Sequence, residues 1–172
     1  MPQYQIVVSD ASVILDLAKT RLIEATLALP FEFVIPDVIL NEELIDLGSY
    51  TATDLIRLGF KIGTLDGTGA AAAMAHYAGN ALKVSINDCF ALAYAQQHKC
   101  ILMTGDGPLR SLAERLNLEV HGFLWAASEI ADRKTFPLDR LVAALKQLQQ
   151  DSSARLPQDA LADLINRFTP SV

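Results

Sequence analysis

Short apolar runs alternate with longer amphipathic stretches along the first 120 positions. Four of the runs are rich in β-branched or aromatic residues, which is typical of strands buried on both faces of a sheet. These expected strands cover residues 4–9, 31–35, 60–65 and 100–104. Residues 118–120 add a short edge strand.

The stretches between these runs have the periodicity of helices. The expected helices begin at Asp10 and cover about 21–29, 36–48, 51–58, 69–78, 85–97 and 109–116. Strands that alternate with helices favour a parallel sheet covered on both faces. The pattern therefore predicts an α/β fold.

The strand signals stop near residue 125. Two apolar stripes at helical spacing follow, one at positions 138, 141, 142, 145 and 148 and the other at 161, 164, 165 and 168. A polar stretch, QQDSSARLPQ, separates them. We therefore expect a sheet domain over residues 1–124 and a helical extension over 125–172, packed on that domain or on a partner.

Composition narrows the class of protein. The 172 residues are 51% hydrophobic and 20% charged, which suits one globular domain. Fourteen Lys and Arg against twenty Asp and Glu leave a net charge of −6, which disfavours a protein that coats nucleic acid. Without CxxC spacing, Cys89 and Cys100 are expected to be buried reduced thiols.

The N-terminus does not resemble a signal peptide, and no apolar run approaches the roughly 20 residues that span a bilayer. We therefore expect a cytoplasmic protein without a membrane segment.

Acidic residues follow the expected strands or begin the helices behind them. Asp10 comes directly after the first strand and Asp106 after the fourth, while Asp88 lies in the first turn of a long helix. Glu42 and Glu43 lie about midway along the helix expected over 36–48. Ligands of open parallel sheets bind beyond the carboxyl ends of the strands, so these carboxylates collect where such a site would be.

Each carboxylate also has a structural interpretation. Asp10 is a good helix cap, and Ser85 with Asp88 resembles a capping box. Asp106 before Gly-Pro suits a turn, and the two glutamates suit a solvated helix face. Converging carboxylates, however, repel one another unless a cation lies among them. Since no His or Cys accompanies them at ligand spacing, the hard cations Mg²⁺ or Mn²⁺ are the natural partners.

Four segments resemble the acidic motifs of PIN-domain nucleases, in the same order and at similar spacing. They are VVSDASVILDLAK, VIPDVILNEEL, SINDCFALAYAQ and ILMTGDGPLRSLAERLNLEV. The resemblance covers residues 4–121. It implies a three-layer α/β/α sandwich and Mg²⁺- or Mn²⁺-dependent hydrolysis of RNA. It also implies that the chain is similar to toxins of the VapC type, which are neutralised by a small antitoxin protein. The apolar stripes of the extension separately suggest a second copy of the chain as a partner.

Carried over by motif, the resemblance implies an acidic cluster of Asp10, Glu43, Asp88 and Asp106, all of them metal ligands. The family motif places Glu directly before Leu, which favours Glu43 over Glu42. The resemblance further implies that Ser12 and Thr104 support the first and last carboxylates by hydrogen bonding.

The last motif departs from the family, because glycines flank Asp106 where polar or basic residues are common. Substrate affinity would come from the basic residues nearest the motifs, namely Lys19, Arg21, Lys83 and Arg110.

Three other interpretations stay open. The stretch from Gly67 to Ala72 fits the dinucleotide fingerprint G-x-G-x-x-A, although the acidic residue that follows, Asp88, lies in a helix rather than at a strand end. GDGP after a strand suggests a haloacid dehalogenase-like phosphohydrolase, although Ser12 stands where that family has its second aspartate. A PIN-like module without catalysis, acting only as a binding partner, is the third.

Overall fold

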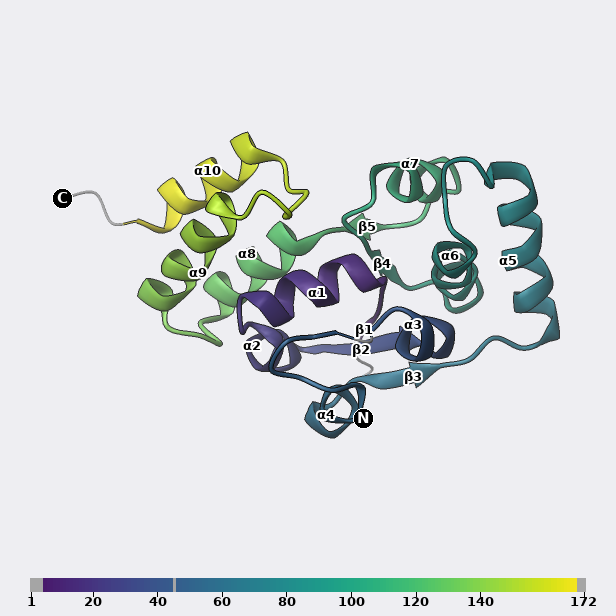
Figure 1. The fold of residues 1–172 in the computed structure, drawn as a ribbon, viewed down its shortest axis with the longest axis horizontal. Helices are drawn as coiled ribbons and strands as arrows, with labels where there is room; N and C mark the ends of the chain where they lie inside the picture. Colours follow the sequence, from purple (N-terminus) through teal and green to yellow (C-terminus); the bar gives the residue numbers. More distant parts are fainter. Residues whose placement is uncertain (1–4, 45, 170–172) are drawn as a thin grey trace.

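The computed structural model describes residues 5–44 and 46–169, and its centre is a parallel sheet (Figure 1). The five strands stand in the order β3-β2-β1-β4-β5. They are β1 (Gln5–Ser9), β2 (Phe31–Pro36), β3 (Lys61–Gly63), β4 (Ile101–Met103) and β5 (Val120–His121). The expected strands are confirmed, with the edge strand two residues later than expected and Tyr4 outside the described residues.

Helices follow the strands and cover both faces of the sheet, as the sequence predicts for an α/β/α fold. They are α1 (Ala11–Lys19), α2 (Ile23–Leu27), α3 (Asp37–Glu42), α4 (Ala52–Leu58), α5 (Gly67–Asn80), α6 (Ile86–His98), α7 (Gly107–Arg115), α8 (Phe123–Arg133), α9 (Leu138–Gln150) and α10 (Gln158–Phe168). The core lies where α1 and α6 meet β1, β2 and β4, and its strand side chains Val7, Val8, Ile35 and Leu102 are fully buried. Cys89 and Cys100 are buried free thiols, as expected.

The helix expected over 36–48 is shorter in the structure. It ends at Glu42, and Glu43 caps it, so these glutamates lie at the helix end and not midway along it. Asp46 accepts a hydrogen bond from the amide of Gly48, whose φ of 65° favours glycine, and this turn leads the chain away from the helix. Ile45 lies outside the described residues.

The C-terminal helices pack at one end of the molecule, next to α1 and α2 (Figure 1). Leu141, Leu145 and Leu148 of α9 are buried, as are Leu161, Ile165 and Phe168 of α10. Helix α8 joins them to the sheet, and the boundary expected after residue 124 falls in its first turn. That boundary stays a prediction. Among the described helices, none has the length and apolar character needed to cross a bilayer.

Candidate active site

The centre of the candidate site is Asp10, at the carboxyl end of the middle strand. Strands β1 and β4 pair with Ser9 opposite Met103, and the Asp10 amide donates to the Met103 carbonyl over 3.0 Å. Asp10 therefore lies beside Thr104, the first residue after β4. The Asp10 side chain begins α1 as its N-cap and accepts from the Val13 amide over 3.3 Å.

Two hydroxyl groups hold the Asp10 carboxylate. Ser12 Oγ donates to one carboxylate oxygen over 2.7 Å, and Thr104 Oγ1 donates to the other. Ser12 Oγ also accepts from the Gly105 amide over 2.9 Å, and Thr104 Oγ1 accepts from the Asp106 amide over 3.0 Å. Each hydroxyl thus connects Asp10 to the turn that follows β4. Both hydroxyls therefore support the first carboxylate, as expected for Ser12. Thr104 does not support the last one in the expected way, because it binds the Asp106 amide and not the Asp106 carboxylate.

Gly105, one of the glycines that depart from the family pattern, is required here for steric reasons. A Cβ at Gly105 would lie 3.1 Å from Ser12 Oγ, which is tighter than ordinary van der Waals contact. A larger residue would push Ser12 away from both Asp10 and the turn. Gly105 therefore permits the close approach on which the hydroxyl contacts depend.

Burial gives Asp10 unusual electrostatics. The side chain is 2% exposed, and desolvation raises its pKa from 3.8 to about 6. The bonds from Thr104, Ser12 and Val13 oppose that rise, while the negative charge of Asp88 adds to it. Within the described residues, no lysine, arginine or histidine forms an ion pair with Asp10. A nearly buried carboxylate thus lies beside a second carboxylate without a cationic partner.

Asp88 stands in the first turn of α6, where it supports the helix start and also lies near other carboxylates. It forms a capping box with Ser85: its Oδ2 accepts from the Ser85 amide over 2.9 Å, and its amide donates to Ser85 Oγ over 3.0 Å. Its charge also raises the pKa of both Asp10 and Glu43. The capping interpretation is therefore confirmed as geometry, and it coexists with a place beside two other carboxylates.

Glu43 approaches the cluster from the end of α3. Desolvation raises its pKa, the Asn87 amide group lowers it, and the charges of Asp88 and Glu42 raise it further. Asn87 Nδ2 also donates to Glu42 Oε2 over 3.1 Å, which ties the end of α3 to the start of α6. Sequence reasoning did not single out Asn87, and its only signal is its place directly before Asp88.

Asp106 is connected to the cluster through the backbone. Its Oδ1 accepts from the Leu109 amide over 2.8 Å, which makes it the N-cap of α7. Its own amide reaches Asp10 through Thr104. Asp106 and Ser12 line the same hollow of about 520 Å³ at the surface. Asp88 thus lies near enough to Asp10 and to Glu43 for its charge to raise the pKa of both, and Asp106 is linked to Asp10 through the Thr104 hydroxyl.

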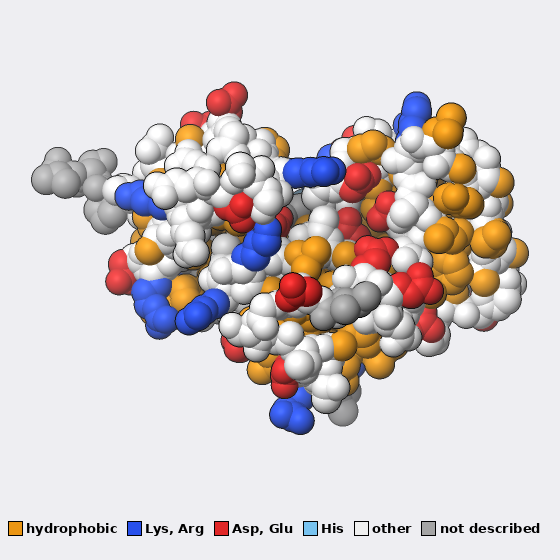
Figure 2. Space-filling view, in the orientation of Figure 1, with side chains coloured by type: hydrophobic (Ala, Val, Ile, Leu, Met, Phe, Trp, Pro, Cys, Tyr) orange, Lys and Arg blue, Asp and Glu red, His pale blue; other side chains and the backbone are white. Residues whose placement is uncertain are grey.

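The donor set suits a hard divalent cation. All four side chains offer carboxylate oxygens, which Mg²⁺ and Mn²⁺ prefer. In Asp88 and Asp106 one oxygen caps a helix, and the other accepts no hydrogen bond from the residues described. Across residues 5–44 and 46–169, no three His, Cys, Asp or Glu side chains are already arranged as a metal-binding group. Figure 2 shows acidic side chains gathered around the middle of the viewed face, with Lys and Arg mostly over the C-terminal helices.

The basic and histidine residues near the motifs have other contacts. Arg110 donates to the carbonyls of Thr104, over 3.1 Å, and Val120, so it stabilises the end of β4. Lys19 binds Asp151 and Ser153. Of the histidines, His121 stacks on Trp125 with the ring centroids 4.6 Å apart.

The glycines of the possible dinucleotide fingerprint, Gly67 and Gly69, lie in the first turn of α5, and Gly69 is closely packed. Asp66 caps α5 by accepting from the Gly69 amide over 2.8 Å, so a carboxylate stands where a phosphate would bind. A Cβ at Gly69 would lie 2.8 Å from the Leu65 side chain. The haloacid dehalogenase interpretation loses its second acid, because Ser12 instead donates to Asp10.

The comparison with protein families agrees with this geometry. A family model described as a PIN domain matches residues 6–170. No curated relative matches the sequence at a significant level. The match covers nearly the whole chain, including the C-terminal helices, and it excludes the dinucleotide-binding and dehalogenase interpretations. The chain belongs to the PIN-domain family, whose members are generally nucleases.

Proposed function

We propose that this chain is a metal-dependent ribonuclease that hydrolyses phosphodiester bonds in single-stranded RNA. The observation that carries the proposal is the nearly buried Asp10 carboxylate, held by two hydroxyls and placed beside Asp88 without a cationic partner. Such an arrangement is unfavourable unless a cation joins it. Family membership supports the nuclease class, and the resemblance of the acidic motifs supports RNA as the substrate.

The carboxylates have different parts in this proposal. Asp10 and Asp88 would hold Mg²⁺ or Mn²⁺ directly, and Glu43 and Asp106 would bind it directly or through water. When bound, the cation supplies positive charge for the phosphate oxygens and acidifies a nearby water molecule. Ser12 and Thr104 keep both Asp10 oxygens oriented, so little reorganisation is needed when the cation binds.

Glu43 is the side chain best suited to accept a proton from the attacking water. It is exposed at the end of α3, and its raised pKa brings it closer to neutral pH, where a general base works best. The sequence offers no Ser/His/Asp or Cys/His set that would supply a protein nucleophile. Direct attack by water is therefore the proposed route.

Cleavage of end-labelled single-stranded RNA tests the proposal. The chain should cleave with Mg²⁺ or Mn²⁺, lose activity in excess chelator and regain it when the metal is added back. A single-stranded DNA of the same sequence is the substrate control. Undiminished RNA cleavage in excess chelator would show that the mechanism is wrong.

The second candidate is a PIN module that binds without catalysis. The helix-capping bonds of Asp88 and Asp106 favour it, because these bonds explain both aspartates without a metal. Under this alternative the chain binds RNA or a protein and cleaves nothing at any metal concentration.

A role as a VapC-type toxin, with a small antitoxin protein as partner, remains a proposal based on the resemblance alone. A homodimer, suggested by the apolar stripes of the C-terminal extension, and a cytoplasmic location, suggested by the sequence of the N-terminus, are also proposals. Co-purification with the product of a small neighbouring open reading frame would test the toxin role.

A further inference from the structure

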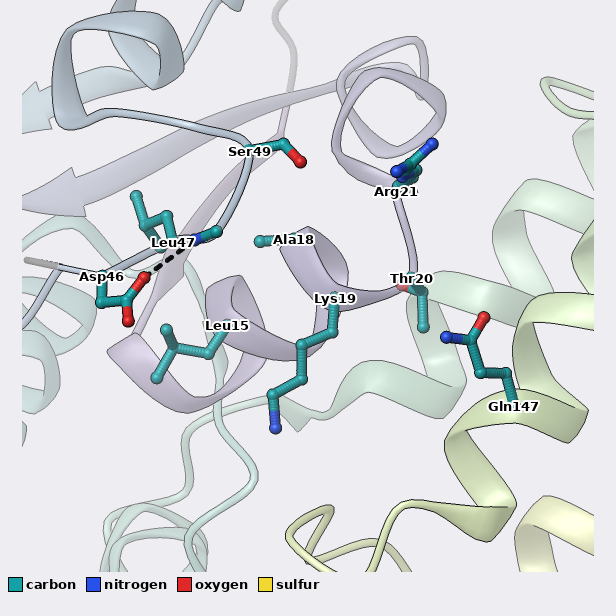
Figure 3. A pocket seen from close by; sticks show the side chains of 10 residues that line it. Leu15, Ala18, Lys19, Thr20, Arg21, Asp46, Leu47, Ser49 and Gln147 are labelled. Atoms are coloured by element: carbon teal, nitrogen blue, oxygen red, sulfur yellow. Dashed lines mark hydrogen bonds between the residues drawn. The ribbon is translucent and has the colours of Figure 1, made fainter.

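Two hollows lie along one exposed face of α1 and meet at its C-terminal half. Ser12, Leu15, Asp16 and Lys19 form this face, at the spacing of residues on one side of a helix. The first hollow, of about 520 Å³, begins at Ser12 and Asp106. The second, of about 610 Å³, shares Leu15 and Lys19 with it and continues between the 46–49 turn and α9 (Figure 3). Together they form a groove that starts at the candidate site.

The C-terminal extension forms the far wall of this groove. Lys19 Nζ donates to Ser153 Oγ over 2.8 Å and to Asp151 Oδ2 over 3.3 Å, so the segment between α9 and α10 lies against α1. Ser153 bonds to Asp151 through its amide and its hydroxyl, and Ala154 beside it is buried. The segment is therefore anchored directly before Arg155, one of the residues that line the first hollow.

Arg155 follows this anchor, and the inference below depends mainly on its side chain. It lines the same hollow as Ser12 and Asp106. It is exposed, and among the described residues it has no hydrogen bond and no ion pair. Among the described residues, an exposed guanidinium group without a hydrogen-bonding or ion-pair partner thus lines the same hollow as Asp16 and Asp106.

We propose that Arg155, together with Lys19, binds backbone phosphates of the RNA strand next to the bond that is cleaved. This inference rests on the proposed ribonuclease function. It makes the C-terminal extension part of the substrate groove and not only a structural cover.

The charges of the groove support an RNA strand as its occupant. Asp16 and Asp106 line the same hollow and repel an anion, so a strand that reaches the site needs cations nearby. Arg155 can bind a phosphate through two parallel hydrogen bonds. The pair of Lys19 with Asp151 is exposed and therefore weak, so Lys19 can exchange this carboxylate for a phosphate. Along α1, Ser12 and Lys19 are about 10 Å apart by helical rise, so the groove extends well beyond the reacting atoms.

The test measures binding without cleavage. A fluorescein-labelled single-stranded RNA is titrated by anisotropy with Asp10→Asn in Mg²⁺ at several salt concentrations. Adding Arg155→Ala should weaken binding roughly fivefold and lower the slope of log K against log salt by about 0.7, as expected for one lost phosphate contact on a single strand. Arg155→Lys keeps the charge but not the two parallel hydrogen bonds, so it should restore the salt slope and only part of the affinity. The control Arg140→Ala removes the same charge from α9, outside the residues that line the groove, and should change neither quantity.

Cleavage by the chain that retains Asp10 gives the second readout. Arg155→Ala should raise KM by a similar factor and leave kcat within about twofold, because a phosphate contact away from the reacting atoms contributes uniform binding. If the parent cleaves RNA while Arg155→Ala matches Arg140→Ala in affinity, salt slope and KM, the inference is wrong and the ribonuclease proposal stands. If the parent neither binds nor cleaves RNA, both are wrong.

Discussion

Replacing Asp10 with Asn should stabilise the metal-free protein at neutral pH, although it removes a side chain with three hydrogen bonds. Burial raises the pKa of Asp10 from 3.8 to about 6, so the folded protein holds a proton that the unfolded chain releases. At pH 7 the folded state must carry a charge that it disfavours. The difference between the two pKa values corresponds to about 3 kcal/mol of lost stability.

Asn removes this penalty at the cost of part of the hydrogen bonding. Asn is as good an N-cap as Asp, so the bond from Val13 is kept. The Asn amide nitrogen cannot accept from Ser12 or Thr104, and one mismatched hydroxyl costs about 1–2 kcal/mol. We expect Asp10→Asn to be more stable by about 1–2 kcal/mol at pH 7.5 in chelator, which raises Tm by several degrees for a chain of this size.

The sign of the effect depends on pH. Below about pH 4 the Asp10 carboxyl is neutral in both states, so the variant gains nothing and loses a hydrogen bond. Between pH 4 and 6 the advantage of Asn grows, and above pH 6 it is constant. Asp16 has a similarly raised pKa but is present in both proteins, so its contribution cancels from the comparison.

Urea denaturation at pH 4, 5, 6 and 7.5 in chelator measures this difference. Asp163→Asn, which removes an exposed charge from α10, is the control and should show no such trend. If Asp10→Asn is destabilised by the same amount at every pH, ionisation of the buried Asp10 carboxylate does not lower the stability of the folded protein, and the reasoning is wrong.

Three smaller predictions follow from the same contacts. Glu43→Gln should reduce kcat at least about a hundredfold if Glu43 is the general base, while Glu42→Gln, its matched control, should stay near the parent in the same RNA cleavage assay. Thr104→Val should destabilise the protein by about 1–3 kcal/mol at pH 7.5 in urea denaturation, because it removes a donor to Asp10 and an acceptor for the Asp106 amide. Since the Thr104 hydrogen bond lowers the pKa of Asp10, its loss should also move the acid limb of the pH–rate profile to higher pH. Leu145→Ala, in the buried face of α9, should cost about 2–5 kcal/mol by the same denaturation assay, whereas an extension that merely rests on the surface would lose little.

Much of the fold could be predicted because its signals are local. Buried parallel strands are short apolar runs, and each is followed by an amphipathic helix, so alternation alone indicated the α/β class. The end of α3 was missed because the pattern VILNEELIDLG stays helical in composition up to Gly48. In the structure the helix already ends at Glu42, and the turn at Asp46 and Gly48 follows it.

The sequence predicts only those site residues whose place follows from their position relative to a strand or helix. Asp10 follows a strand, and the parallel sheet therefore places it at the edge where ligands bind. The contacts of Lys19 with Asp151 and Ser153 join positions 132 and 134 apart in the sequence, and no local pattern indicates them. Arg155 lies in a stretch whose composition predicts only a linker, and its place in the hollow that Asp106 also lines depends on how the extension folds back.

The claim that the capping aspartates also hold a metal is tested most directly by Mn²⁺ binding to the parent and to Asp88→Asn. Asn replaces Asp88 with nearly the same shape and keeps a capping oxygen, so α6 should still form. Calorimetric titration at pH 7.5 should show saturable Mn²⁺ binding to the parent and binding at least about tenfold weaker to Asp88→Asn. Equal Mn²⁺ affinity in the two proteins would contradict the account, because Asp88 would then be a helix cap and nothing more.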